Sequence, residues 1–213
     1  MMRICRFVPL ALLCLALTAP ASGWAQTPAA GQASDGIGTQ TVRRANTQVQ
    51  ELLRQKAEPN SPEEKKLASQ VTRSVRDFLD IETLGKRAMR DHWGKLSAGE
   101  RREFVQLLRE LVEANYIKAL RANVNYEVKY VGEKEEGDQL VVQTEIEAKR
   151  RGRPRTIEIA YVLTRDGQAW RAFDVVTDGI GLVENYRAQF NKIIKSDGFA
   201  GLMDRMRKKR AKM

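Results

Sequence analysis

The chain has 213 residues, 42% of them apolar and 30% charged, which allows one domain with a sizeable core and excludes a mainly disordered protein. The formal net charge is +10, but removing Arg3 and Arg6 near the N-terminus and the six basic residues of 205–213 leaves only about +2. The basicity is therefore local, and nucleic-acid binding would depend on the C-terminal tail alone.

Residues 1–25 are typical of a secretory signal peptide. Two arginines precede an apolar run that is too short for a membrane span, and small residues around Ala25 form a cleavage site. Both cysteines, Cys5 and Cys14, lie in this segment, so the mature chain is expected to lack disulfides, thiolate nucleophiles and cysteine metal sites. Residues 26–38 are rich in small and polar residues and are expected to form a disordered leader. The predicted location is the periplasm.

Helical spacing of apolar residues dominates the first half of the chain. Capping boxes at Ser61 to Glu64 and at Ser97 to Glu100 mark the starts of two helices. The expected helices are 39–56, 61–79, 81–90 and 97–120.

The period then changes to two, which is typical of strands. Alternating segments near 126–130, 140–148, 157–163 and 170–176 are separated by turns, among them a strong hairpin signal at Asp166-Gly167. The sequence predicts an α+β fold: a four-stranded antiparallel meander with helices packed on one face. The expected domain is 39–204.

The last strand leads through a polar turn into an amphipathic helix that starts near Leu182, and a short helix follows Gly198. The basic tail, 205–213, is expected to be solvated or to contact anionic headgroups or an acidic partner.

The mature chain offers little catalytic chemistry. Its one histidine, His92, is expected in a connection between helices as a packed or half-exposed side chain. Asp174 is expected on the same strand face as Trp170 and Ala172, as a cap or tie to the next turn or an arginine. A general-base role for Asp174 is the alternative, but no second titratable partner lies in a recognisable motif. The protein is therefore expected not to be an enzyme and to carry no metal or cofactor.

Four segments in order resemble the MlaC, or toluene-tolerance, family of periplasmic phospholipid-binding proteins. They are IETLGKRAMRDHWGKLS (81–97), EFVQLLRELVEANYIKAL (103–120), YVLTRDGQAWRAFDVV (161–176) and GIGLVENYRAQF (179–190). The similarity covers about residues 40 to 205. One departure is Gly181, where many relatives carry a serine that could cap the following helix.

The resemblance implies a phospholipid carrier that acts as a monomer. It would shuttle lipid between an outer-membrane lipoprotein–porin complex and an inner-membrane ABC transporter with its substrate-binding ring, and so serve outer-membrane lipid asymmetry. The alternatives are a carrier for hopanoids or another apolar lipid, a non-catalytic envelope scaffold with a filled core, and an enzyme with Asp174 as base.

A carrier requires an apolar cavity, which we expect between the apolar sheet face and the helices. Its expected wall is Phe104, Leu108, Val112, Tyr116, Val142, Ile159, Tyr161, Phe173, Val175, Leu182, Tyr186 and Phe190. Trp93 is expected to be a structural plug, and Arg187 to tie its helix to Asp174 or Asp178.

Overall fold

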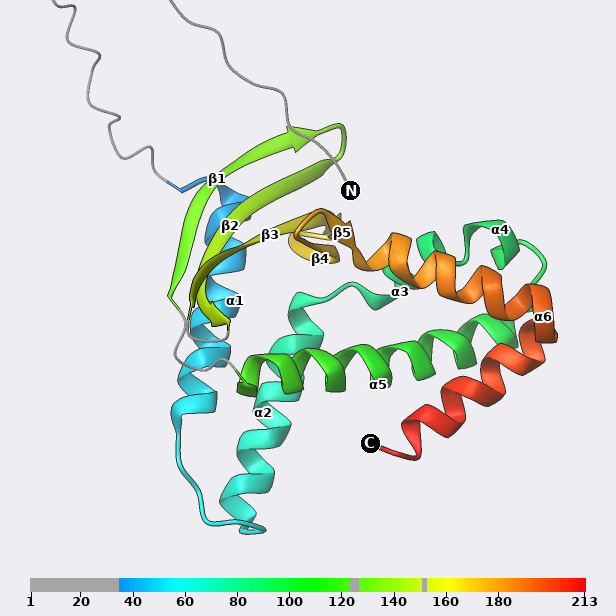
Figure 1. Cartoon of the computed structure of the whole chain (residues 1–213), viewed down its shortest axis with the longest axis horizontal. Coiled ribbons are helices and arrows are strands. Elements are labelled where there is room, and N and C mark those ends of the chain that lie inside the picture. The colour runs from blue at the N-terminus through cyan, green and yellow to red at the C-terminus, as the bar shows by residue number, and fades with distance from the viewer. Residues whose placement is uncertain (1–34, 123–126, 151–152) are drawn as a thin grey trace, which may run out of the picture. The chain divides into compact units, whose positions relative to one another are not determined.

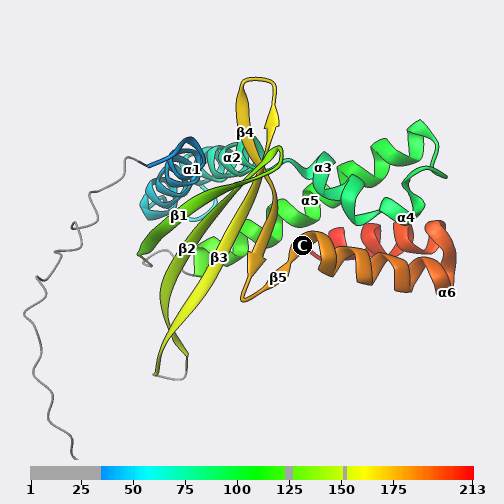
Figure 2. The ribbon, with the colours of Figure 1, turned by 90° about the horizontal axis from the view of Figure 1, so that it is seen from above.

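The computed structural model describes residues 35–122, 127–150 and 153–213 (Figure 1). The expected signal peptide and residues 26–34 of the expected leader lie outside the described residues. Residues 35–213 form one unit, an α+β domain in which helices flank an antiparallel sheet (Figures 1 and 2).

The predicted helices are present, with shifted ends. They are α1 (Ile37–Arg54), α2 (Pro62–Phe78), α3 (Ile81–Ala88), α4 (Arg90–Trp93), α5 (Ala98–Ala122) and α6 (Leu182–Arg210). Both predicted serine caps form: Ser61 Oγ accepts from Glu64 N at 3.1 Å, and Ser97 Oγ accepts from Glu100 N at 3.2 Å. The reciprocal bond that completes a capping box is present at Ser97, whose N–H donates to Glu100 Oε2 at 2.8 Å, whereas Glu64 Oε2 accepts from Asn60 N at 2.6 Å. The expectation that His92 lies in a connection is wrong, because the chain makes one more turn of helix there, α4.

The sheet contains the four predicted strands and one short addition. Its order is β1 (Val128–Glu136), β2 (Gln139–Arg150), β3 (Arg153–Asp166), β4 (Ala169–Thr177) and β5 (Ile180–Gly181), with all neighbours antiparallel. Connections of two residues join consecutive strands from β1 to β4, as expected for a meander. The two-residue strand β5 extends the edge of β4 just before α6 begins.

One face of the sheet carries the core. Val142, Tyr161 and Leu163 are buried there against α1 and α2, while Glu147 and Glu158 are exposed on the other face. Helix α5 contacts α2 and α3, and α6 lies beside α5 and α3 (Figure 1). The helices therefore build the second layer that buries the apolar face of the sheet.

A β-bulge in β4 changes which residues share a face. Leu163 pairs with Ala172 and Val162 pairs with Asp174, so Phe173 is an extra residue between the two pairs. Ala172 and Phe173 are consequently both buried, at 1% and 3% exposure. The expectation that Asp174 shares a face with Ala172 is wrong, because the bulge turns Asp174 to the other side.

Asp174 caps helix α6 from the neighbouring strand. Its Oδ1 accepts a hydrogen bond from Val183 N at 3.1 Å, while Gly181 at the N-cap position offers no side-chain acceptor. The predicted cap role of Asp174 is thus confirmed. A Cβ at position 181 would lie 2.8 Å from Asp174 Oδ2, so glycine leaves room for the carboxylate.

Arg187 makes neither of its predicted ties. Its guanidinium donates to Arg87 O at 3.0 Å, and Asp178 pairs with Arg155 instead. The reason is that Arg187 lies one turn beyond the helix start, where it meets α3 and not the β4 turn.

A guanidinium on β4 caps the C-terminus of α2. Arg171 donates to Arg76 O at 2.8 Å, Leu79 O at 2.6 Å and Asp77 O at 3.2 Å. These carbonyls belong to the last turn of α2 and its C-cap, which have no helical donors of their own. Asp80, which follows the C-cap residue Leu79, donates its backbone N–H to Ala172 O at 2.8 Å. This bond joins the α2–α3 junction to β4.

The short helix predicted after Gly198 is present as the last part of α6, which is kinked at Gly198 and continues to Arg210. Arg207 Nε lies 3.1 Å from Glu103 Oε1, and Arg210 lies 3.4 Å from Glu110, both on α5. The basic segment up to Arg210 is therefore helical, and two of its arginines pair with α5. Its basic side chains remain exposed, in keeping with the expected solvated segment.

We expect Asp174→Asn to gain stability relative to the wild type as the pH rises from about 4 to 7. Burial raises the pKa of Asp174 in the folded protein. Hydrogen bonds from backbone N–H groups lower this pKa, but by less than burial raises it. The contribution of this group therefore favours folding below the unfolded-state pKa of about 3.9 and is lost as the pH rises through the higher folded-state pKa. Asparagine keeps an acceptor for Val183 N but does not ionise.

Urea unfolding at each pH measures the free energies of unfolding of the variant and the wild type. Asp138→Asn, in an exposed turn, is the control. A difference between Asp174→Asn and the wild type that stays constant with pH would contradict the expectation.

We expect Arg171→Met to lower the free energy of unfolding by about 2 kcal/mol, because three helix-terminal carbonyls lose a charged donor. Arg102→Met, at an exposed position of α5, should change it by less than about 0.5 kcal/mol. Chemical denaturation of both variants measures the two free energies, and equal stabilities would show that Arg171 does not hold the α2 terminus.

Candidate functional site

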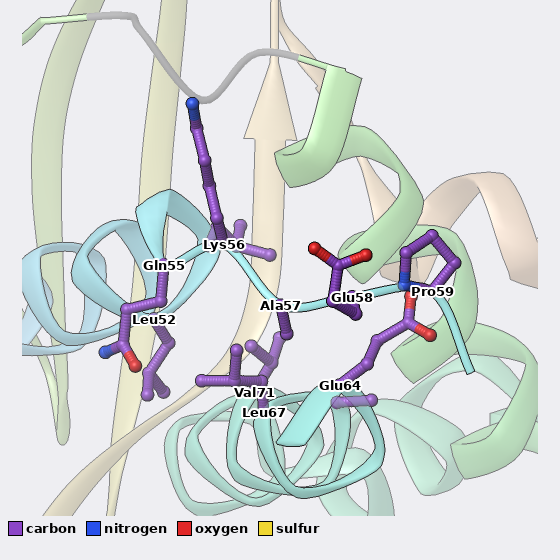
Figure 3. A pocket seen from close by; sticks show the side chains of 11 residues that line it. Leu52, Gln55, Lys56, Ala57, Glu58, Pro59, Glu64, Leu67 and Val71 are labelled. Carbon is purple, nitrogen blue, oxygen red and sulfur yellow. The ribbon is translucent and has the colours of Figure 1, made fainter. Parts of the chain in front are cut away.

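A cleft opens between the C-terminal end of α1 and the first half of α2. It has a volume of about 670 Å³ (Figure 3). Its floor is apolar and its rim is polar. The floor comprises Leu52, Leu53, Ala57, Leu67, Ala68 and Val71, and the rim comprises Gln55, Lys56, Glu58, Pro59 and Glu64.

The local sequence explains why the two helices leave space here. Helix α1 ends at Arg54 and Gln55 is already extended, with φ −68° and ψ 134°. The connection then passes Pro59 and Asn60, whose φ is 64°, before the Ser61 cap starts α2. A connection of this length separates the helix ends, so the leucines nearest to it are only half-buried.

The apolar floor continues inward along both helices. A second, small hollow of about 10 Å³ is lined by Ala45, Asn46, Val49, Ser74, Val75, Phe78 and Tyr116. Val49 and Val75 lie one helical turn from Leu53 and Val71 of the cleft, on the same faces of α1 and α2. Along these helix faces the cleft of about 670 Å³ is thus followed by a separate hollow of about the minimum size for one water.

The twelve residues of the predicted wall are placed in three groups. Three aromatic residues meet between α5 and α6: Phe104 lies 5.5 Å from Phe190, which stacks on Tyr186 at 5.4 Å between ring centroids. Beneath the sheet, the ring of Tyr161 lies 5.8 Å from that of Phe78. The members near the sheet are Val142, Ile159, Tyr161, Phe173 and Val175, and those on helices outside the aromatic group are Leu108, Val112, Tyr116 and Leu182.

Protein atoms already surround most of these side chains. Seven of the twelve are at most 5% exposed: Phe104, Leu108, Val112, Val142, Tyr161, Phe173 and Phe190. Tyr116 is the member that borders a hollow, the small one between α1, α2 and α5. The lipid-wall role of the twelve stays a prediction, and a hydrocarbon chain beneath the sheet would require these side chains to separate.

The sequence did not predict the cleft, because periodicity cannot distinguish a helix face that packs from one that borders an opening. Leu52, Leu53, Leu67 and Val71 appear in the sequence as ordinary helix stripes. The one local signal was the connection itself, in which Pro59 and Asn60 follow an alternating Lys56, Ala57, Glu58.

The remaining candidate chemistry belongs to structure. His92 Nε2 lies 2.9 Å from Asn191 Oδ1, and Asn191 Nδ2 donates to Asp91 Oδ2 at 3.0 Å, a bond that lowers the pKa of Asp91. This chain of contacts fastens α4 to α6. Trp93 is half-buried beside Phe104, with ring centroids 6.4 Å apart, in keeping with a structural role.

Metal-binding clusters and membrane-spanning helices are both absent from the described ranges 35–122, 127–150 and 153–213. Within them, no three His, Cys, Asp or Glu side chains are grouped closely enough to hold a metal ion. Nor does any helix in this part of the chain combine the length and apolar character that crossing a membrane requires.

The chain is similar to known proteins in sequence. The family model described as "MlaC protein" matches residues 43–208. The chain is 24% identical over 132 residues to the intermembrane phospholipid transport system binding protein MlaC of Haemophilus influenzae, and the match spans 61% of each protein.

The fold is also similar to that of a phospholipid-binding protein from Ralstonia solanacearum, solved in complex with a phospholipid. The two structures superpose with a TM-score of 0.66 at 21% identity, over 84% of this chain and 98% of that one. At this identity the likeness concerns the fold. Since the family model covers most of the chain, the family itself is established: this protein belongs to the MlaC family.

Proposed function

We propose that this protein is a periplasmic carrier that binds one phospholipid and moves it between the two membranes of the envelope. The observation that carries the proposal is a cleft of about 670 Å³ with an apolar floor and a polar rim, in a chain of the MlaC family. This volume falls within the range of small-molecule binding pockets, about 300–1,000 Å³. The two relatives, a phospholipid transport binding protein and a phospholipid complex, support the choice of cargo.

The energetics explain why a carrier is needed. Each methylene transferred from water to an apolar site gains about 0.8 kcal/mol, so two acyl chains cross water at a cost on the order of 20 kcal/mol. A carrier must hold the lipid with about the same free energy as the bilayer does, and need not hold it more tightly, because the lipid must both enter and leave. An apolar floor that binds chains without fixed polar contacts meets this condition, and direction then comes from the partners.

In the proposed complex, acyl chains enter the cleft and extend inward toward Tyr116. The hollow at Tyr116 is nearly closed, so chains of full length must displace side chains between α1, α2 and α5. Such widening would bring the chains toward Val112 and Ile159, two members of the predicted wall that pack in or against the same core. The headgroup stays at the polar rim, in water.

The proposed partners are those of a shuttle: an outer-membrane lipoprotein–porin complex and an inner-membrane ABC transporter with its substrate-binding ring. The signal peptide predicted from residues 1–25 supports a location between these membranes. The protein would act as a monomer, without a cofactor and without catalysing a reaction.

The first test blocks the cleft. We expect Ala68→Trp to lower the phospholipid that copurifies from the envelope about tenfold, because an indole in the cleft occupies space that the lipid needs. Fitting both would cost about 1–3 kcal/mol, and about 1.4 kcal/mol corresponds to a tenfold loss of affinity. Mass spectrometry of a solvent extract from detergent-free protein measures the lipid. The matched control is Ala188→Trp, on the exposed side of α6. Equal lipid in both variants would remove this cleft from the cargo path, and no lipid in the wild type would end the carrier proposal.

The second test addresses the predicted wall. Val112→Trp should lower bound lipid while the protein remains folded, if chains reach the space beneath the sheet. Because Val112 is only 3% exposed, some loss of stability is expected, about 1–3 kcal/mol. Thermal unfolding followed by circular dichroism separates this loss from lipid release. Normal lipid content in a folded Val112→Trp protein would remove this position from the wall.

A further inference from the structure

The rim of the cleft carries charges of both signs. Lys56 and Glu58 lie two residues apart in the connection between α1 and α2, and Glu64 lies in the first turn of α2. Figure 3 shows the ammonium of Lys56 and the carboxylate of Glu58 extending to the same side of the connection. All three residues are exposed, while the floor beneath them is apolar and half-buried or buried.

Two of these charges are available to a ligand. Among the described residues, the side chains of Lys56 and Glu58 have no hydrogen-bond or ion-pair partner, and the two do not pair with each other. Glu64 is fixed differently: its Oε2 accepts from Asn60 N at 2.6 Å and its own N–H binds Ser61 Oγ. The bond from Asn60 thus holds the Glu64 carboxylate at the rim.

The balance of charge at the mouth is one cation against two carboxylates. A lipid bound in the cleft leaves its phosphate and headgroup at this rim, because both are too polar for the floor. The phosphate complements Lys56. The headgroup substituent beyond the phosphate then meets Glu58 and Glu64, which repel an anion and attract a cation.

We propose that this rim selects phospholipids whose headgroup places a primary ammonium next to the phosphate, and disfavours headgroups with a net negative charge. The inference depends on the proposed function, since it concerns the headgroup of the proposed cargo. A primary ammonium has three N–H donors for the two carboxylates. A quaternary ammonium has the charge but no N–H donor, so it should be intermediate.

The expected preference is modest. The three side chains are exposed, and exposed ion pairs are weak and screened by salt. We therefore expect about a threefold enrichment of the aminated lipid over the anionic one at low salt, and a smaller enrichment at high salt.

The experiment offers delipidated full-length mature protein an equal mixture of two lipids. Vesicles of phosphatidylethanolamine and phosphatidylglycerol with matched acyl chains are incubated with the protein, which is then separated and analysed by native mass spectrometry. The ratio of the two bound lipids reports the headgroup preference, and their sum reports lipid binding as such. Glu58→Lys should lower the ratio to about one or below, and Glu58→Gln should give an intermediate value.

The matched control is Glu135→Lys, which makes the same change of net charge at an exposed position of β1 outside the cleft lining. It should keep the wild-type ratio. A ratio that falls in Glu58→Lys and not in Glu135→Lys supports the inference.

Three results would overturn it. If the wild type binds lipid normally but shows no preference, or if both charge reversals change the ratio equally, the rim does not select the headgroup, and the carrier proposal stands. If the wild type takes up neither lipid, the carrier proposal and the headgroup inference fail together.

Discussion

The arrangement of this domain depends on the junction between α2 and α3 being fastened to strand β4. The helix α2 ends with carbonyls that have no helical donor, and β4 has backbone groups beyond the two residues that β5 covers. Each deficit is met by the other element: Arg171 of β4 donates to the α2 carbonyls, and Asp80 N donates to Ala172 O. Buried backbone groups must be paired, so this junction fixes where α2 lies under the sheet.

The sheet also supplies hydrogen-bond partners at the start of two other helices. Helix α1 follows Gly36 and helix α6 follows Gly181, and neither glycine offers a capping side chain. Carboxylates of the sheet take that role: Glu133 of β1 accepts from Thr39 N, and Asp174 of β4 accepts from Val183 N. An acid at a helix N-terminus also complements the helix dipole. Because cap and helix belong to different elements, each bond ties a helix to the sheet and not only to itself.

These ties leave one end of the helical layer less constrained. Helix α2 is held at its C-terminal end by Arg171 and, from its own last turn, by the bidentate pair of Arg76 with buried Glu113 on α5, at 2.9 Å for both contacts. The opposite ends of α1 and α2 are joined by the connection at Lys56 to Asn60, and the cleft lies there. This distribution suits the proposed carrier: the anchored end supplies a stable core, while the open end presents the apolar floor of the cleft.

The sequence by itself determined the fold class, the helices, four strands and both serine caps, because these depend on periodicity and on contacts between near neighbours in the chain. The family was indicated by the resemblance of four segments in order. The cap role of Asp174 was also predictable, since a half-buried carboxylate requires donors. Tertiary structure alone decided the rest. The bulge at Phe173 placed Asp174 on the opposite face of the sheet. The position of such an extra residue depends on how the strands pair and cannot be read from the alternation of side chains. Arg171 and Arg187 found carbonyl partners some 90 to 100 residues away, and such a distance has no local signal. The cleft depends on how far α1 and α2 separate, which the packing of the whole helical layer fixes and a stripe of leucines does not reveal.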